Sequence, residues 1–256
     1  MELIRTEFKL RPTTQGQRLN SNCGPLMQGV IMERIRPEYG EVLHISELKP
    51  YSQYLIHEAN EDTWVLQTLT HDSGNEIWNI AAIKQLEKIR LEHNDMEIGV
   101  AERSFTKLSE DELLNQTFFG DCPRKVSVDF VTPTAFKSGG AYVNYPTIRH
   151  VFQSLLNKFN AVSTNSSLDV DMVLGDIENN IAVTGYRLKS TYFHLEGIRI
   201  PSFVGSLSLV TKGPQQMANL AYMLLKFGTY SGIGIKTAMG MGGMRIAERN
   251  VTRWRQ

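Results

Sequence analysis

The segment GTYSGIGIKTAMGMGG (228–243) constrains the fold of this chain more than any other stretch. Six of its sixteen residues are glycine, and Lys236 carries its one charge. A backbone so poor in side chains can approach another backbone or a ligand more closely than ordinary residues allow. The question that the segment raises is what comes so close to it.

Two familiar glycine-rich nucleotide motifs do not fit the spacing. The dinucleotide pattern G-x-G-x-x-G needs a glycine where Thr237 stands, and Lys236-Thr237 lies inside the stretch without the order of a Walker loop. What remains is G-x-G-x5-G-x-G over Gly232, Gly234, Gly240 and Gly242. Its N–H groups could cradle phosphates, with Lys236 as a cation and Thr237 as a donor. The alternative is a glycine-rich turn that lets a helix pack closely on a sheet.

The charges are divided unevenly along a chain of zero net charge. Residues 1–122 hold 12 Lys and Arg against 20 Asp and Glu, whereas residues 123–256 hold 15 against 7. A basic half of this kind favours an anionic partner, with nucleic acid as the first candidate, although unevenly distributed surface charge is the simpler explanation. No run of 18 apolar residues occurs, which argues against a membrane span. Cys23 and Cys122 have neither zinc nor disulfide spacing, so we expect reduced thiols in a cytoplasmic protein.

The two halves repeat one order of elements, namely strand, helix, hairpin, helix and strand. In the first half the apolar spacing predicts these elements at 2–10, 26–35, 53–59 with 63–70, 80–89 and 96–105. In the second half it predicts them at 124–136, 146–159, 181–211, a helix opened by Pro214, and 244–248. The fold class is therefore α+β, with two tandem ferredoxin-like (βαββαβ) domains at 1–122 and 123–256.

Several stretches together carry a family resemblance. They are FGTYSGIGIKTAMGMGG (227–243), VTPTAF (131–136), YPTIRHVFQSLLNKFN (145–160), FVGSLSLV (203–210) and LHISELKPYS (43–52). With these motifs the chain resembles the RAMP superfamily, and within it the CRISPR-associated endoribonucleases that cut precursor CRISPR RNA within its repeats. The glycine loop is shared by many RAMP proteins, and the His-to-Lys-Pro segment favours the repeat-cleaving enzymes. The resemblance implies tandem ferredoxin-like domains.

The resemblance also implies a catalytic segment just after the first helix. His44 is the candidate general acid or base, because imidazole exchanges protons near neutral pH, and Lys49 is the candidate stabiliser of phosphate charge. Some family members carry a catalytic tyrosine on the first helix, where this chain has Met32. Tyr39, Tyr51 or solvent could supply the second proton carrier. The expected products are a 2′,3′-cyclic phosphate and a 5′-hydroxyl.

RNA binding is expected mainly from the second half. The candidate residues are Gly232, Gly234, Lys236, Thr237, Gly240, Gly242 and Arg245. No cofactor and no metal are expected. The partners are precursor CRISPR RNA repeats, an effector complex that receives the product, or a second copy of the chain. Two other functions stay open: a non-cleaving RAMP subunit that binds CRISPR RNA without needing His44, and a protein-interaction module whose glycines are structural.

Overall fold

The computed structural model describes residues 1–12, 19–58, 61–79, 81–91 and 96–247. The first sheet draws on β1 (Glu2–Pro12), β2 (Tyr51–Glu58), β3 (Glu61–Thr68), β4 (Lys88–Leu91) and β5 (Met96–Ser109). Its helices are α1 (Gly24–Met32), α2 (Pro37–Ile45), α3 (His71–Ser73), which continues as a π-helical turn (Gly74–Trp78), and α4 (Ala81–Lys84). Helix α5 (Glu110–Gln116) leads to the second sheet.

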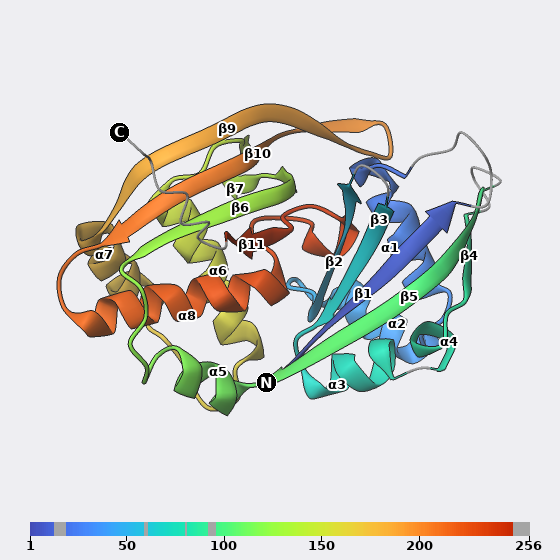
Figure 1. Ribbon diagram of the computed structural model, residues 1–256, viewed down its shortest axis with the longest axis horizontal. Coiled ribbons are helices and arrows are strands. Elements are labelled where there is room, and N and C mark those ends of the chain that lie inside the picture. The colour runs from blue at the N-terminus through green and yellow to red at the C-terminus, as the bar shows by residue number, and fades with distance from the viewer. Residues whose placement is uncertain (13–18, 59–60, 80, 92–95, 248–256) are drawn as a thin grey trace, which may run out of the picture.

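The second sheet is built from residues that follow α5. Its strands are β6 (Lys125–Thr134), β9 (Ile181–Leu195), β10 (Ile198–Thr211) and β11 (Met244–Ile246), and a small hairpin pairs β7 (Phe136–Ser138) with β8 (Ala141–Val143). Its helices are α6 (Ile148–Val162), α7 (Val170–Asn180) and α8 (Gln215–Ser231). Figure 1 shows the two sheets side by side, with α8 running from the second unit toward the first.

The strand orders confirm the predicted fold class. The sheets run β2-β3-β1-β5-β4 and β11-β6-β10-β9, with every neighbouring pair antiparallel. Apart from β4 at one edge, both sheets have the 4-1-3-2 order that a βαββαβ chain forms. The chain therefore folds as two ferredoxin-like units in tandem.

The helix predicted at 80–89 is wrong over most of its length. Ile80 lies outside the described residues, α4 covers only Ala81–Lys84, and Ile89 belongs to β4. Residues 88–91 alternate exposed and buried side chains and pair with β5, so Ile89 and Leu91 enter the core from a strand. Apolar residues spaced by three fit a helix, but the hydrogen bonds that residues 88–91 form with the edge of the sheet outweigh this local preference.

Helices α2, α3, α5 and α7 have no counterpart in the sequence-based prediction, and α2 and α7 are the two that occupy equivalent places in the two units. Helix α2 begins with Pro37 in its first turn, where the missing N–H costs nothing. Helix α7 is capped by Asp169, whose carboxylate accepts from the Met172 amide at 3.0 Å. Both are inserted between the first helix of a unit and its hairpin, so they lengthen the units without changing the order of the sheets.

The two units share a core and a polar junction. One apolar cluster joins Leu3 and Leu69 of the first unit to the α6 and α8 side chains of the second. Buried Glu110 accepts hydrogen bonds from Ser163 and from the amide and hydroxyl of Thr164. Burial alone would raise the pKa of Glu110, but these bonds and the Met1 amino group bring it down to about 2.

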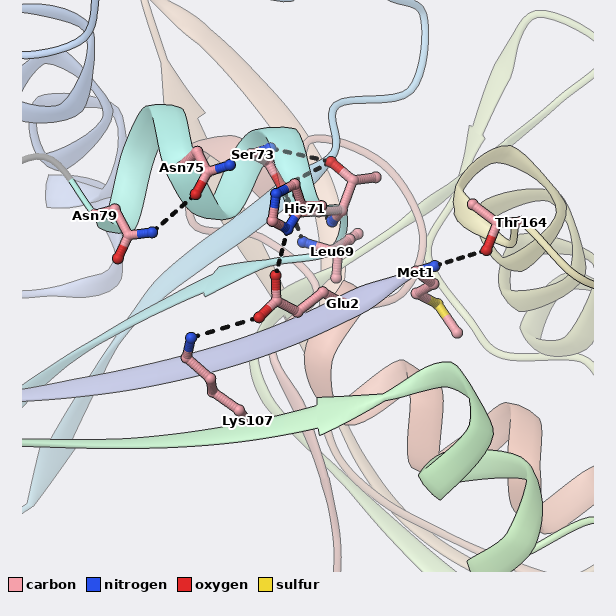
Figure 2. Close-up of polar contacts among 10 residues, drawn as sticks. Met1, Glu2, Leu69, His71, Ser73, Asn75, Asn79, Lys107 and Thr164 are labelled. Carbon is pink, nitrogen blue, oxygen red and sulfur yellow. Dashed lines mark hydrogen bonds and ion pairs between the residues drawn. The ribbon is translucent and has the colours of Figure 1, made fainter.

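The start of β1 lies at this junction. Figure 2 shows the Met1 amino group donating to the Thr164 hydroxyl, at 3.0 Å. The next residue, Glu2, accepts from Lys107 at 3.4 Å and lies 3.1 Å from His71 Nδ1 (Figure 2). The Met1 contact ties the beginning of the first sheet to the α6–α7 connection of the second unit, whereas the Glu2 contacts stay within the first unit.

Candidate active site

The glycine segment is pressed against protein backbone. A Cβ at Gly242 would lie 2.0 Å from the carbonyl oxygen of Ile233, and one at Gly234 would lie 2.2 Å from that of Ala135. Both glycines also have positive φ, at 69° and 74°. Side chains are therefore excluded because the segment folds back on itself at Ile233 and packs against Ala135 of another stretch. The structure gives these glycines the close-packing role that the sequence left as the alternative.

Most of the loop amides already have protein acceptors. The Gly232 amide donates to Gly228 O at 3.0 Å, that of Gly242 to Pro133 O at 3.0 Å, and that of Gly234 to the Ser154 hydroxyl at 2.8 Å. An amide bonded in this way is not free to bind a phosphate. Gly232, Gly240 and Gly242 are moreover buried. The amides of Gly232, Gly234 and Gly242 are therefore engaged with protein acceptors, and binding of RNA by the loop stays a prediction.

Lys236 is the one charged residue of the loop, and it is half-buried. Its φ of 54° places it in the left-handed region, which costs a lysine roughly 1 kcal/mol or more and persists only where neighbours impose it. The Met239 amide donates to Lys236 O at 2.9 Å and so fixes this turn. Thr237 beside it is buried. The fixed turn therefore restricts where the Lys236 side chain can lie.

A groove of about 820 Å³ lies beside the loop, and we call it the loop groove. Both units contribute to its walls. Its lining residues are Gln28, Glu47, Leu48, Lys49, Phe136, Lys137, Ser138, Tyr142, His150, Gln153, Ser154, Asn157, Lys158 and residues 234–239. Of the residues predicted for RNA binding and catalysis, the groove brings together Lys49, Gly234, Lys236 and Thr237.

His44 lies next to the loop groove without lining it. It is an exposed residue in the last turn of α2, four residues before the wall formed by Leu48 and Lys49. Lys49 Nζ donates to His44 O at 3.4 Å and to Ser46 O at 2.5 Å. The lysine thus ties the end of α2 to the groove and leaves the imidazole free in solvent.

Comparison with known proteins identifies the family. A family model described as CRISPR-associated endoribonuclease Cas6 matches residues 128–244. A Streptococcus thermophilus protein of that name is 34% identical over 229 residues, covering 86% of this chain and 90% of its own length. One from Mycobacterium tuberculosis is 32% identical over 227 residues, covering 88% of this chain and 72% of its own. The chain belongs to the Cas6 family of CRISPR-associated endoribonucleases.

Solved Cas6 structures share the fold. A Cas6 product complex superposes with a TM-score of 0.80 at 19% identity, covering 97% of this chain and all of the other. A Thermus thermophilus Cas6 gives 0.73 at 19% identity, with 96% and 98% covered. The tandem arrangement of two ferredoxin-like units is therefore that of Cas6 proteins, and the family match confirms the resemblance that the motifs indicated.

Burial shapes the chemistry of Tyr39 and Tyr51, the two tyrosines considered as the second proton carrier of this Cas6 chain. Burial, together with the carboxylates of Asp72 and Glu76, raises the pKa of Tyr39 well above its usual value. Tyr39 also lies about 140° around the α2 axis from His44, at 100° per residue. Tyr51 is buried, which raises its pKa, and its hydroxyl accepts from Gln28 at 3.2 Å. Met32, at the family tyrosine position, lies close to Gly40 of α2.

Arg245 lies away from the loop groove. It lines a second cavity of about 1270 Å³, together with Arg5, Lys125 and Lys226. Its guanidinium is 3.6 Å from a carboxylate oxygen of Asp129. The structure therefore separates Arg245 from Lys236, although the two are only nine positions apart in sequence.

Among the groove residues that the sequence did not predict, three lie on one face of α6. His150, Ser154 and Lys158 recur every four residues along α6, so they share one face of the helix. His150 stacks on Phe136 with ring centroids 5.4 Å apart, and its Nδ1 lies 2.8 Å from the Thr147 hydroxyl. In the sequence, this polar stripe beside the apolar face of α6 is the feature that indicates a groove-facing side of the helix. Lone polar residues on an amphipathic helix normally face solvent, which hides such a signal.

Within the described part of the chain, no three His, Cys, Asp or Glu side chains lie close enough to hold a metal ion. Cys23 and Cys122 are both unpaired and buried. None of the described helices is long and apolar enough to cross a membrane.

Proposed function

We propose that this Cas6 protein cleaves precursor CRISPR RNA within its repeats, at the loop groove, by attack of a ribose 2′-hydroxyl on the adjacent phosphodiester. One observation carries the proposal. Lys49, from the unit that holds His44, and Lys236, from the glycine loop of the other unit, line the same groove. An RNA bound in that groove would contact cations from both units, one of which, Lys49, lies five residues after His44.

His44 supplies the proton transfer in this proposal. Its imidazole takes the proton of the attacking 2′-hydroxyl or donates one to the leaving 5′-oxygen, and the exposed ring can turn toward either. The reaction breaks the P–O5′ bond and forms a P–O2′ bond. It leaves a 2′,3′-cyclic phosphate and a 5′-hydroxyl and needs no metal ion.

Lys49 supplies the charge. The negative charge on the phosphorane oxygens grows in the transition state, and a preplaced ammonium in a groove stabilises it. Lys49 is held by the carbonyls of His44 and Ser46, so its position depends on the same turn as the imidazole. Tyr39 stays a weaker candidate for the second proton carrier, because its phenol releases a proton less readily than an ordinary tyrosine.

The division of labour between the units is part of the proposal. Residues 1–122 form the unit with the catalytic segment, and residues 123–256 form the unit whose loop binds the RNA backbone. Retention of the product, transfer to an effector complex, and a homodimer remain predictions.

The test is cleavage of labelled CRISPR repeat RNA in excess EDTA. We expect one cut by the wild type and a rate about 10²–10⁴-fold lower for His44→Ala with RNA affinity unchanged. Lys49→Ala should lower the rate as well. His71→Ala is the matched control, because His71 is exposed and faces Glu2 outside the groove. Its rate should equal that of the wild type.

Three other outcomes of this experiment would contradict the proposal or favour another function. Salt-sensitive binding without any cleavage by the wild type would make the protein a non-cleaving RAMP subunit. No RNA affinity at any salt concentration would support the protein-interaction module. Equal rates for the wild type and His44→Ala would contradict the role of His44.

A further inference from the structure

Lys158 is a buried lysine without a described carboxylate partner. The residue is 8% exposed, and no ion pair to it is formed by any described Asp or Glu. Buried cations normally have an anion beside them, since removing an ammonium from water is costly. A site that keeps a cation without an anion is arranged for an anion from outside.

The oxygens around Lys158 hold it loosely. Nζ lies 3.3 Å from Ser231 O, 3.2 Å from Gly232 O and 3.3 Å from the Thr237 hydroxyl. Charged N–H donors usually approach their acceptors to about 2.7–2.9 Å. All three contacts are longer, so one N–H can turn from the hydroxyl to another acceptor at little cost. Lys158 also lines the loop groove, so such an acceptor can reach it from there.

We infer that Lys158 is the floor of a phosphate subsite in the loop groove, where a phosphodiester of the bound RNA replaces the Thr237 hydroxyl as its partner. Lys236, held in its left-handed turn two residues after Gly234, provides the second cation of this subsite. One helical turn before Lys158, Ser154 fixes the Gly234 amide, so α6 positions both the loop and the cation beneath it. The inference rests on the proposed function, because it places the RNA in this groove.

The electrostatics of the groove give the subsite a measurable signature. Burial lowers the pKa of Lys158 to about 7 in the free protein. The charged and titratable side chains that line the groove with it are Glu47, Lys49, Lys137, Tyr142, His150 and Lys236. Cations outnumber the single carboxylate, so nothing on the protein restores the charge of Lys158. A phosphate beside it does, and RNA binding then takes up a proton at Lys158.

The experiment measures the affinity of a fluorescent CRISPR repeat RNA between pH 6 and 9, in the His44→Ala background so that the RNA stays intact. Above pH 7 we expect Kd to rise by about tenfold per pH unit, because binding must return a proton to Lys158. Ordinary histidines, with an unperturbed pKa near 6.5, are already mostly neutral above pH 7. The wild-type background should show the same uptake by calorimetry in two buffers of different ionisation enthalpy.

Two variants test whether Lys158 is the group that takes up the proton. In Lys158→Met binding should be weaker at pH 6.5 and independent of pH above 7, so that it matches the parent at pH 9. In Lys137→Met, where an exposed groove lysine is lost, affinity should fall by the same factor at every pH. If Lys158→Met does not fold, the proton uptake of the parent still decides.

RNA binding with a Kd that is constant from pH 7 to 9 overturns the role of Lys158 and leaves the proposed function intact. The same pH slope in a folded Lys158→Met also overturns it. Absence of RNA binding at every pH overturns both proposals.

Discussion

The glycine loop and the segment from α2 to Lys49 meet at one groove, but the fold holds them in opposite ways. The loop is buried, and its amides and glycine positions are in contact with β6, α6 and α8. Helix α2 buries only Leu43, and Ile45 at its end is 84% exposed. A tightly packed segment places cations accurately, whereas a segment with few buried contacts can adjust its imidazole to the substrate. We infer that binding is assigned to the first and proton transfer to the second.

The largest expected effect comes from filling space in the loop. Gly242→Ala should lower the free energy of unfolding by about 4 kcal/mol, because the new Cβ overlaps Ile233 O and alanine resists positive φ. Denaturant unfolding measures it. Gly175→Ala is the control, since Gly175 lies in α7 with open space around it, and it should be neutral or slightly stabilising. Equal stability of Gly242→Ala and the wild type would contradict the packing role.

The next effect tests how the loop is attached to the first unit. Buried Gln53 donates to Gly24 O at 2.8 Å and to Ala238 O at 3.0 Å, and accepts from Trp64 Nε1 at 3.0 Å. Gln53→Leu leaves three buried groups without partners and should cost about 3 kcal/mol of unfolding free energy. Gln153→Leu, on the groove side of α6, should change stability by less than about 0.5 kcal/mol. A similar loss of unfolding free energy in both variants would contradict the role of the Gln53 hydrogen bonds in attaching the loop to the first unit.

A smaller effect depends on pH and on the junction between the units. The pKa of Glu110 is about 2 in the folded protein, below the value of about 4.3 in an unfolded chain. Glu110 therefore stabilises the fold above pH 4.3, and this stabilisation disappears as the pH falls toward 2. Glu110→Gln should lose about 2 kcal/mol at pH 7 and approach the wild type near pH 2.

Denaturant unfolding at several pH values follows that difference. A gap between wild type and Glu110→Gln that is constant from pH 7 to 2 would assign the loss to packing rather than to charge. RNA cleavage at pH 7 by the folded fraction should be unchanged, because Glu110 is outside the groove.

The smallest effect is expected on the other side of the comparison. Ile45→Ser changes a side chain that is already in water, so unfolding free energy should move by less than about 0.5 kcal/mol. Thermal and denaturant unfolding measure it. A loss above 1 kcal/mol would mean that the end of α2 is held as firmly as the glycine loop, and the contrast between the two segments would fail.

The sheets were largely predictable from sequence. The hairpin expected at 181–211 is formed by β9 and β10, and the helix expected after Pro214 is α8, which begins at Gln215. These elements have clear local periods, and local period reflects which face is buried. Residues 80–89 were mispredicted because Ile83, Leu86 and Ile89 fit a helix as well as they fit two shorter elements.

For the candidate functional side chains, the sequence indicated some and only the tertiary structure placed the others. The family resemblance that the motifs carry indicated His44 and Lys49, and the glycine loop was visible in the sequence itself, because both depend on residue type and order along the chain. Only the tertiary structure separated Arg245 from Lys236, bonded the loop amides to protein, and brought His150 and Lys158 of α6 to the groove. These outcomes depend on which surfaces meet across two units, and contacts between residues distant in sequence leave no local period for the sequence to display.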